Sequence, residues 1–288
     1  MPEGYTHVRT ANIALNYAKV PNYNEACFTA GANGPDTFFC YRVWSKKRVV
    51  NLPRIGADMH NRHCGEFLQG LIVNAKTDAQ KGYAQGFLCH YALDSVVHPY
   101  IEFLTSKGQP YHEKAGHGYY EIALDSTLFK ADYGTRTRFY NITCPKIIGK
   151  NLAEVSRQLK ICFDSYFTKD IPVDAVADSF HHFYTLHRLF YSKFGIKKFL
   201  MGLAELLLFR KKGFITVHIM PAKLKENLPS DWVNPFTNTN ETGGIQRLLA
   251  QGTQDGISLL RGAESFWQGK ITLEKLAEII GNKSYIKG

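Results

Sequence analysis

Residues 86–99 read Gly86-Phe87-Leu88-Cys89-His90-Tyr91-Ala92-Leu93-Asp94-Ser95-Val96-Val97-His98-Pro99, and this stretch carries the strongest signal in the chain. His90, Asp94 and His98 are spaced four residues apart, so on a helix they share one face. The other positions are markedly apolar, and three ionisable groups on such a buried helix are costly without partners. We therefore predict a metal-binding helix over 78–98 that ends before Pro99. An amphipathic helix with an incidental polar face is the alternative.

Apolar periodicity predicts that most of the chain is helical, and the fold class we expect is an all-α, multi-helix bundle. The run at 214–219 has the composition of a strand, but it has no evident partner. Residues 229–244 are polar and are expected to form a long surface loop. We predict one domain over 1–288, with the metal-site residues within 1–130 and residues 131–288 packed around them. The expected helices cover residues 8–19, 57–76, 78–98, 117–130, 151–168, 174–192, 196–210, 244–268 and 272–281.

Composition fits a globular protein with an anionic partner. The 288 residues are 44% apolar and 21% charged, and the formal net charge of +10 suits phosphate esters, nucleic acid or an acidic membrane surface. The start of the chain lacks a secretory-leader pattern, and no apolar stretch is long enough to span a bilayer. The six cysteines form no CxxC pair, so we expect reduced thiols and a cytoplasmic location, with disulfides as the alternative.

Five further candidate ligands lie outside the central stretch, and each is a weak signal by itself. Asp36 follows a rigid Gly-Pro turn. His117 and Glu121 stand one helical turn apart, and Asp125 continues their stripe. Together with the central helix they offer only imidazole nitrogens and carboxylate oxygens, which suit zinc in a hydrolytic site with open positions. These five candidates are His7, Asp36, His60, His117 and Glu121.

The order of these residues resembles the zinc-dependent phospholipase C family of bacteria, in particular its shorter members without a leader. The resemblance covers residues 1 to about 130. It implies an all-α bundle of the kind shared with fungal single-strand nucleases, with three zinc ions in a cleft. The motifs that carry it are His7, Gly34-Pro35-Asp36, Met59-His60, Cys89-His90-Tyr91-Ala92-Leu93-Asp94-Ser95, His98-Pro99-Tyr100 and His117-x-x-x-Glu121.

The resemblance also implies how the ligands are shared among the ions. Asp94 would bridge two of them, because it would help to bind the first and would hold the second together with His7. The first ion would take Asp36, His60, His90 and Asp94, and the third would take His98, His117 and Glu121.

Two departures from the family pattern leave alternatives open. The secreted members begin with a Trp whose amine and carbonyl bind a zinc, whereas the first Trp here is Trp44. Two ions are therefore the alternative to three, and the ion held by His7 and Asp94 is the one in doubt. The interval from Asp36 to His60 is also longer than in the family, which leaves His63 as an alternative ligand.

The function implied is zinc-dependent hydrolysis of phosphate esters by a phospholipase C-like phosphodiesterase with a phospholipid-like substrate. Asp36 and Glu121 are the candidates to accept the proton of the attacking water, although each is also a candidate ligand. A single-strand nuclease, which would take nucleic acid as its substrate, and a metal-binding protein without catalysis are the alternatives.

Residues 193–212 combine basic ends with an apolar centre. A helix buried in the core is the first explanation for this pattern. Peripheral contact with an anionic membrane is the alternative. Similarly, His181, His182 and His187 lie in an aromatic-rich stretch and are expected to be packed side chains rather than ligands.

Overall fold

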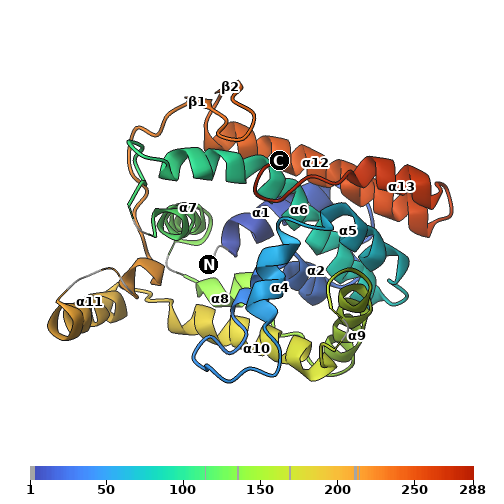
Figure 1. The fold of residues 1–288 in the computed structure, drawn as a ribbon, viewed down its shortest axis with the longest axis horizontal. Helices are drawn as coiled ribbons and strands as arrows, with labels where there is room; N and C mark the ends of the chain where they lie inside the picture. The colour runs from blue at the N-terminus through green and yellow to red at the C-terminus, as the bar shows by residue number, and fades with distance from the viewer. Residues whose placement is uncertain (1–3, 114, 135, 169, 211–212, 214) are drawn as a thin grey trace.

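The computed structural model describes residues 4–113, 115–134, 136–168, 170–210, 213 and 215–288, and its fold is all-α as predicted. Helices surround one long central helix, and a small two-stranded hairpin lies at one end (Figure 1). Within the described residues the elements are α1 (Tyr5–Ala18), α2 (Glu25–Gly31), α3 (Asp36–Phe39), α4 (Leu52–Met59), α5 (Cys64–Val73), α6 (Asp78–Thr105), α7 (Gly116–Tyr133), α8 (Phe139–Thr143), α9 (Gly149–Tyr166), α10 (Val173–Leu189), α11 (Ile196–Phe209), η1 (Thr216–His218), β1 (Asp231–Val233), β2 (Asn240–Thr242), α12 (Ile245–Trp267) and α13 (Leu273–Ile280).

The central helix α6 is fixed at its start by a capping box, in which Thr77 accepts from the backbone N–H of Gln80. Its backbone then passes very close to that of α2. A Cβ on Gly86 would lie 2.0 Å from the carbonyl oxygen of Phe28, so only glycine allows this approach. Helices α2 and α12 pack along α6, and His90, Asp94 and His98 on its polar face are buried.

The main hydrophobic core joins distant parts of the chain. It contains Cys27 from α2, Phe87 from α6, Phe163 from α9 and Tyr285 from the C-terminal segment, all buried. The C-terminal segment therefore lies beside the central helix, where it reaches the polar cluster described below.

The helix expected over 57–76 is wrong as a single element, since α4 ends at Met59 and α5 begins at Cys64. His63, between them, has a φ of 55°, which no helix accepts. The predicted end of the central helix at His98 is also wrong. The helix continues through Pro99 to Thr105, because Val97, Tyr100 and Ile101 pack in a second region of the core and outweigh one lost hydrogen bond.

The described part of the run at 214–219, which has no evident strand partner in the sequence, contains the short 3₁₀ helix η1 (Thr216–His218). One prediction for the C-terminal half needs correction. The expected loop 229–244 contains the antiparallel pair β1 and β2, in which Trp232 is opposite Glu241. Trp232 is buried against Tyr100 and Phe103 of α6, which holds the hairpin to the central helix.

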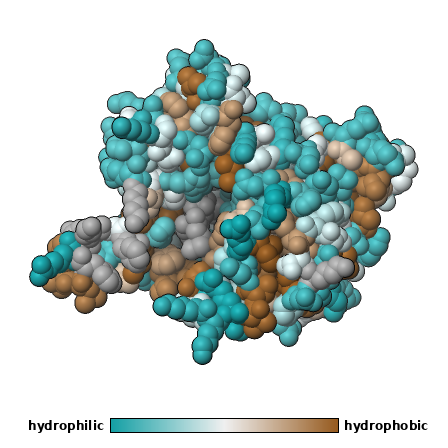
Figure 2. Space-filling view, in the orientation of Figure 1, coloured by the Kyte–Doolittle hydropathy of each residue, from teal (hydrophilic) through white to brown (hydrophobic). Residues whose placement is uncertain are grey.

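Helix α11 does not belong to the core, so the explanation of residues 196–210 as a buried helix is wrong. It projects from the body of the protein (Figure 1), and its surface is largely hydrophobic (Figure 2). None of the described helices is long and apolar enough to cross a membrane. All six cysteines are buried, and Cys27, Cys64, Cys89, Cys144 and Cys162 are free thiols.

Candidate metal centre

Helix α6 presents His90, Asp94 and His98 on one face, and the Asp94 carboxylate lies between the two histidines. Its Oδ2 atom is 3.0 Å from Nε2 of His90 and 3.6 Å from Nδ1 of His98. All three side chains are buried. The four-residue spacing thus produces the shared face that the sequence predicts.

The loop before α3 and the end of α4 bring Asp36 and His60 to the same carboxylate. Nε2 of His60 is 3.3 Å from Oδ1 of Asp36 and 3.8 Å from Oδ2 of Asp94. Gly34 makes this approach feasible: its φ is +50°, and a Cβ there would lie 2.3 Å from the His90 ring. The Gly34-Pro35-Asp36 turn is therefore shaped by contact with the imidazole of His90.

Helix α1 adds His7, whose Nε2 is 3.2 Å from Oδ1 of Asp94 and whose ring stacks on that of His90. Asp125 of α7 fixes the start of α1. Its buried carboxylate accepts hydrogen bonds from the backbone N–H groups of Tyr5 and Thr6 and from the Thr6 hydroxyl. Asp125, which extends the His117 and Glu121 stripe in the sequence, thus positions His7 rather than joining the cluster.

Helix α7 presents His117 and Glu121 to the other end of the cluster. Oε1 of Glu121 is 3.0 Å from Nε2 of His117 and 3.6 Å from Nε2 of His98. On its other side, Nδ1 of His117 lies 3.3 Å from Oε1 of Glu102 on α6. A carboxylate behind a ligating histidine orients the ring and raises its basicity. Sequence reasoning missed Glu102, although it stands four residues beyond His98 on the same helix.

The imidazoles are oriented for metal binding. Nδ1 of His60 is 2.7 Å from the carbonyl oxygen of Gly56, Nδ1 of His90 is 3.2 Å from that of Ala32, and Nδ1 of His98 is 2.9 Å from that of Tyr285. A carbonyl only accepts, so Nδ1 donates in each case. In the neutral rings Nε2 then carries a lone pair that faces a carboxylate, which is the arrangement found around a bound cation.

Several buried atoms of the cluster have no hydrogen-bond partner among the described residues. They include Nε2 of His90, Oδ2 of Asp94, Oε2 of Glu121 and Nδ1 of His7. His90 and Asp94 lie 3.0 Å apart without the geometry of a hydrogen bond, as two acceptors directed at one ion would. Three groups of side chains bring their ligand atoms within 4.8 Å of one another: His7, Asp36 and His90; His60, His90 and Asp94; and His98, His117 and Glu121.

The electrostatics of the cluster keep its carboxylates ionised. Burial raises the pKa of Asp94, but His98, His90 and His7 lower it more, so the pKa lies well below its usual value. Burial likewise opposes ionisation of Glu121, but His117 keeps its pKa well below normal. Burial lowers the pKa of His90. Ionised carboxylates and neutral imidazoles are the forms that bind zinc.

The protonation of His98 shows how much positive charge the cluster demands. Burial lowers the pKa of His98, but Asp94 and Glu121 raise it further, to about 9. A proton on His98 and a metal ion compete for the same nitrogen, so a bound cation would replace this charge.

A cavity of about 210 Å³ opens at the cluster, so the side chains are accessible to a small ligand. Tyr285 and Ile286 reach the cluster from the C-terminal segment, and no sequence motif marks either residue. The residues that line the cavity are Asp36, Phe39, Ala57, His60, Asn61, Asp94, His98, His117, Glu121 and Ile286.

The remaining histidines named in the sequence lie elsewhere. His63, the alternative to His60, is half exposed beside Tyr166 and Phe167. His187 is buried and bonded through Nδ1 to the carbonyl oxygen of Phe183. The question of a terminal amine as a ligand falls on residues 1–3, which lie outside the described residues.

The sequence of the chain matches one known family. The model of the family described as zinc dependent phospholipase C matches residues 6–171, more than half of the chain. This range contains all eight candidate ligands, from His7 to Glu121. No curated protein and no solved structure matches the chain.

Proposed function

The chain belongs to the zinc-dependent phospholipase C family, and on this basis we propose that it hydrolyses phosphodiesters with zinc held by the cluster on α1, α3, α4, α6 and α7. One observation carries the proposal. Buried, ionised carboxylates and imidazole nitrogens converge around an open cavity, and buried carboxylates need compensating positive charge, which zinc ions would supply.

We propose that the ligands are divided as the family pattern implies. Asp94 is central, because its two oxygens face His7 on one side and His60, His90 and His98 on the other. His98, His117 and Glu121 form a separate group at the far end. Two or three zinc ions are the proposed content, and the two-ion alternative lacks the ion held by His7 and Asp94. The eight proposed ligands are His7, Asp36, His60, His90, Asp94, His98, His117 and Glu121.

Zinc in such a site neutralises phosphoryl oxygens and makes water nucleophilic near neutral pH. The protein's own part is to hold the ligands, to exclude bulk water from α6 and to receive a proton. Asp36 and Glu121 are the carboxylates proposed for the last role, because both line the cavity at opposite ends of the cluster. Their low pKa values keep them ionised and able to accept.

A phospholipid-like diester is the proposed substrate. A nuclease is expected to offer several stacking platforms beside its cleft, whereas Phe39 is the phenyl ring among the described residues that line this cavity. We also propose a cytoplasmic location, which the free thiols of Cys27, Cys64, Cys89, Cys144 and Cys162 support.

An assay panel tests the proposal. Zinc-loaded protein is offered phosphatidylcholine, bis-p-nitrophenyl phosphate and single-stranded DNA, each with and without a chelator. Chelator-sensitive hydrolysis of both diesters and little cleavage of DNA are expected. Fast cleavage of DNA alone would establish the nuclease instead. Bound zinc without hydrolysis of any substrate would establish a metal-binding protein.

A further inference from the structure

Helix α11 exposes a continuous apolar stripe to water. Large side chains recur at intervals of three and four residues, which places them on one helical face. Phe199 is 72% exposed and Leu207 is 75% exposed. Contiguous apolar patches on a protein surface mark a site of interaction, whereas single exposed side chains do not. The α11 stripe consists of Ile196, Phe199, Leu200, Leu203, Leu206 and Leu207.

The carboxylate of α11 points in the opposite direction. Glu205 is only 2% exposed. It accepts hydrogen bonds from the backbone N–H groups of Gly213, Ile215 and Thr216 and from the Thr216 hydroxyl. The helix is therefore held with the carboxylate of Glu205 inward and its leucines outward, the reverse of an ordinary surface helix. This arrangement fixes the α11 stripe in its exposed position.

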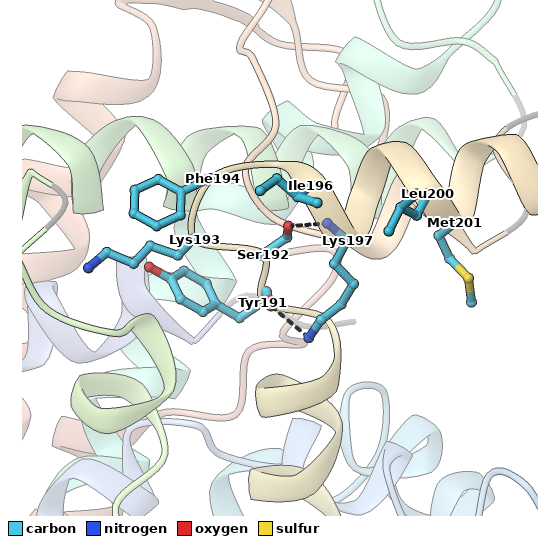
Figure 3. A pocket seen from close by; sticks show the side chains of 8 residues that line it. All are labelled: Tyr191, Ser192, Lys193, Phe194, Ile196, Lys197, Leu200 and Met201. Carbon is cyan, nitrogen blue, oxygen red and sulfur yellow. Dashed lines mark hydrogen bonds between the residues drawn. The ribbon is translucent and has the colours of Figure 1, made fainter.

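The base of α11 is tied to the body by polar contacts. The Ser192 hydroxyl accepts from the backbone N–H of Lys197, and Nζ of Lys197 donates to the carbonyl oxygen of Tyr191 (Figure 3). Nζ of Lys198 donates to the carbonyl oxygen of Pro221. These contacts leave the apolar face of the helix largely exposed.

The surface beside the stripe is basic. Lys193 lines a pocket together with Ile196 and Leu200 of the stripe (Figure 3). Arg210, at the end of the helix, is exposed. The chain as a whole carries a net charge of +10. An apolar stripe between basic side chains complements a surface with an anionic layer outside an apolar interior.

We propose that the α11 stripe inserts into the boundary between headgroups and acyl chains of a bilayer that contains anionic phospholipids. A second copy of the chain is a poorer occupant. A symmetric contact through this face would bring the basic side chains at the two ends of the helix, Lys193 and Arg210, close to those of the other copy. The proposal goes beyond the proposed hydrolysis, because the stripe shares no residue with the metal centre.

The test is binding of full-length protein to sedimented vesicles of phosphatidylcholine mixed with phosphatidylglycerol. The variant Phe199→Gln with Leu207→Gln should bind at least about tenfold more weakly, because it removes two inserted side chains. The control variant, Val49→Gln with Ile148→Gln, changes two side chains that are each 73% exposed elsewhere on the surface and should bind like wild type. Wild type should also bind pure phosphatidylcholine more weakly than the mixed vesicles.

Parallel measurements separate the outcomes. The stripe variant and the control variant should hydrolyse bis-p-nitrophenyl phosphate at the wild-type rate if folding is intact. Asp94→Asn, in contrast, should lose hydrolysis but bind vesicles like wild type. Equal vesicle binding by the stripe variant and wild type would overturn the proposal. If wild type is a dimer and the stripe variant is a monomer, the partner of the α11 stripe is a second copy of the chain and not a bilayer. Should the stripe variant misfold, Lys193→Gln with Arg210→Gln must weaken binding to the mixed vesicles.

Discussion

Replacing Asp94 with Asn should damage the metal centre more than replacing any other single ligand. The change keeps the size of the side chain and removes its charge. Asp94 lies within 4 Å of imidazole nitrogens of His7, His60, His90 and His98. A neutral amide cannot balance the cations that these nitrogens would share.

The matched comparison is Glu121→Gln, because the ion pairs of Glu121 within the described residues are with His98 and His117. We expect Glu121→Gln to lose the zinc of that group, whereas Asp94→Asn should lose zinc from both groups that surround it. Hydrolysis by Asp94→Asn should fall by at least ~100-fold, the scale of removing one stabilising group from an active site. That factor corresponds to about 2.7 kcal/mol of transition-state stabilisation.

Elemental analysis of the purified proteins measures zinc per chain, and bis-p-nitrophenyl phosphate measures hydrolysis. Asp164→Asn serves as the control, since Asp164 pairs with Lys160 on the surface of α9. It should retain the zinc content and the rate of wild type. Circular dichroism should show that Asp94→Asn keeps its helices, because the apolar side of α6 is unchanged.

Two results would refute the reasoning. A full zinc complement in Asp94→Asn would mean that α6 is not the centre of the site. A wild-type protein without any transition metal after expression in zinc-supplemented medium would remove the basis of the proposal.

Three further predictions follow from the structure. Hydrogen bonds lower the pKa of Glu205 from 4.5 to about 2 despite burial. The stability that ionised Glu205 contributes is therefore full above pH 4.5 and is lost as the pH falls toward 2. The difference in free energy of unfolding between wild type and Glu205→Gln should shrink over that range, and a difference that grows would contradict this role. Burial raises the pKa values of Cys27 and Cys162 to about 12, so a thiol reagent should react slowly with the native protein. Once the protein is unfolded without reductant, the reagent should react with all six cysteines. Reaction of two or fewer cysteines would contradict the cytoplasmic location. Hydrolysis of phosphatidylcholine should be faster in vesicles mixed with phosphatidylglycerol than in pure vesicles, and equal rates would argue against an anionic interface.

The parts of the fold that sequence predicts well are those with a local cause. Capping at Thr77 and the four-residue spacing of His90, Asp94 and His98 act within one helix, so they determine α6 and its polar face. The boundaries failed where distant packing decides. Pro99 remains helical because Tyr100 and Ile101 are buried against other elements, which no local rule detects.

The site divides along the same line. The eight candidate ligands are chemically distinctive, so their types and order suffice to propose them. Tyr285 is different: it contributes a backbone carbonyl oxygen, which accepts from His98. Any residue could supply that group, and only the folded path of the C-terminal segment brings it there. Glu102 is an intermediate case. Its four-residue spacing from His98 can be seen in the sequence, but its pairing with His117 depends on where α7 packs.

The metal centre and the α11 stripe violate the ordinary rule of burial in opposite directions. In the first, ionised carboxylates such as Asp94 are enclosed by protein; in the second, Leu207 and its neighbours face water while Glu205 is buried. Each violation disfavours the isolated protein, and each is relieved by something the chain itself does not supply. A buried cluster of acceptors requires cations, and an exposed apolar helix with basic neighbours requires an apolar medium behind an anionic surface. Because the two features share no side chain, loss of zinc and loss of vesicle binding should be separable by mutation, and a chemical step on a diester should not depend on α11 unless that diester lies in a bilayer.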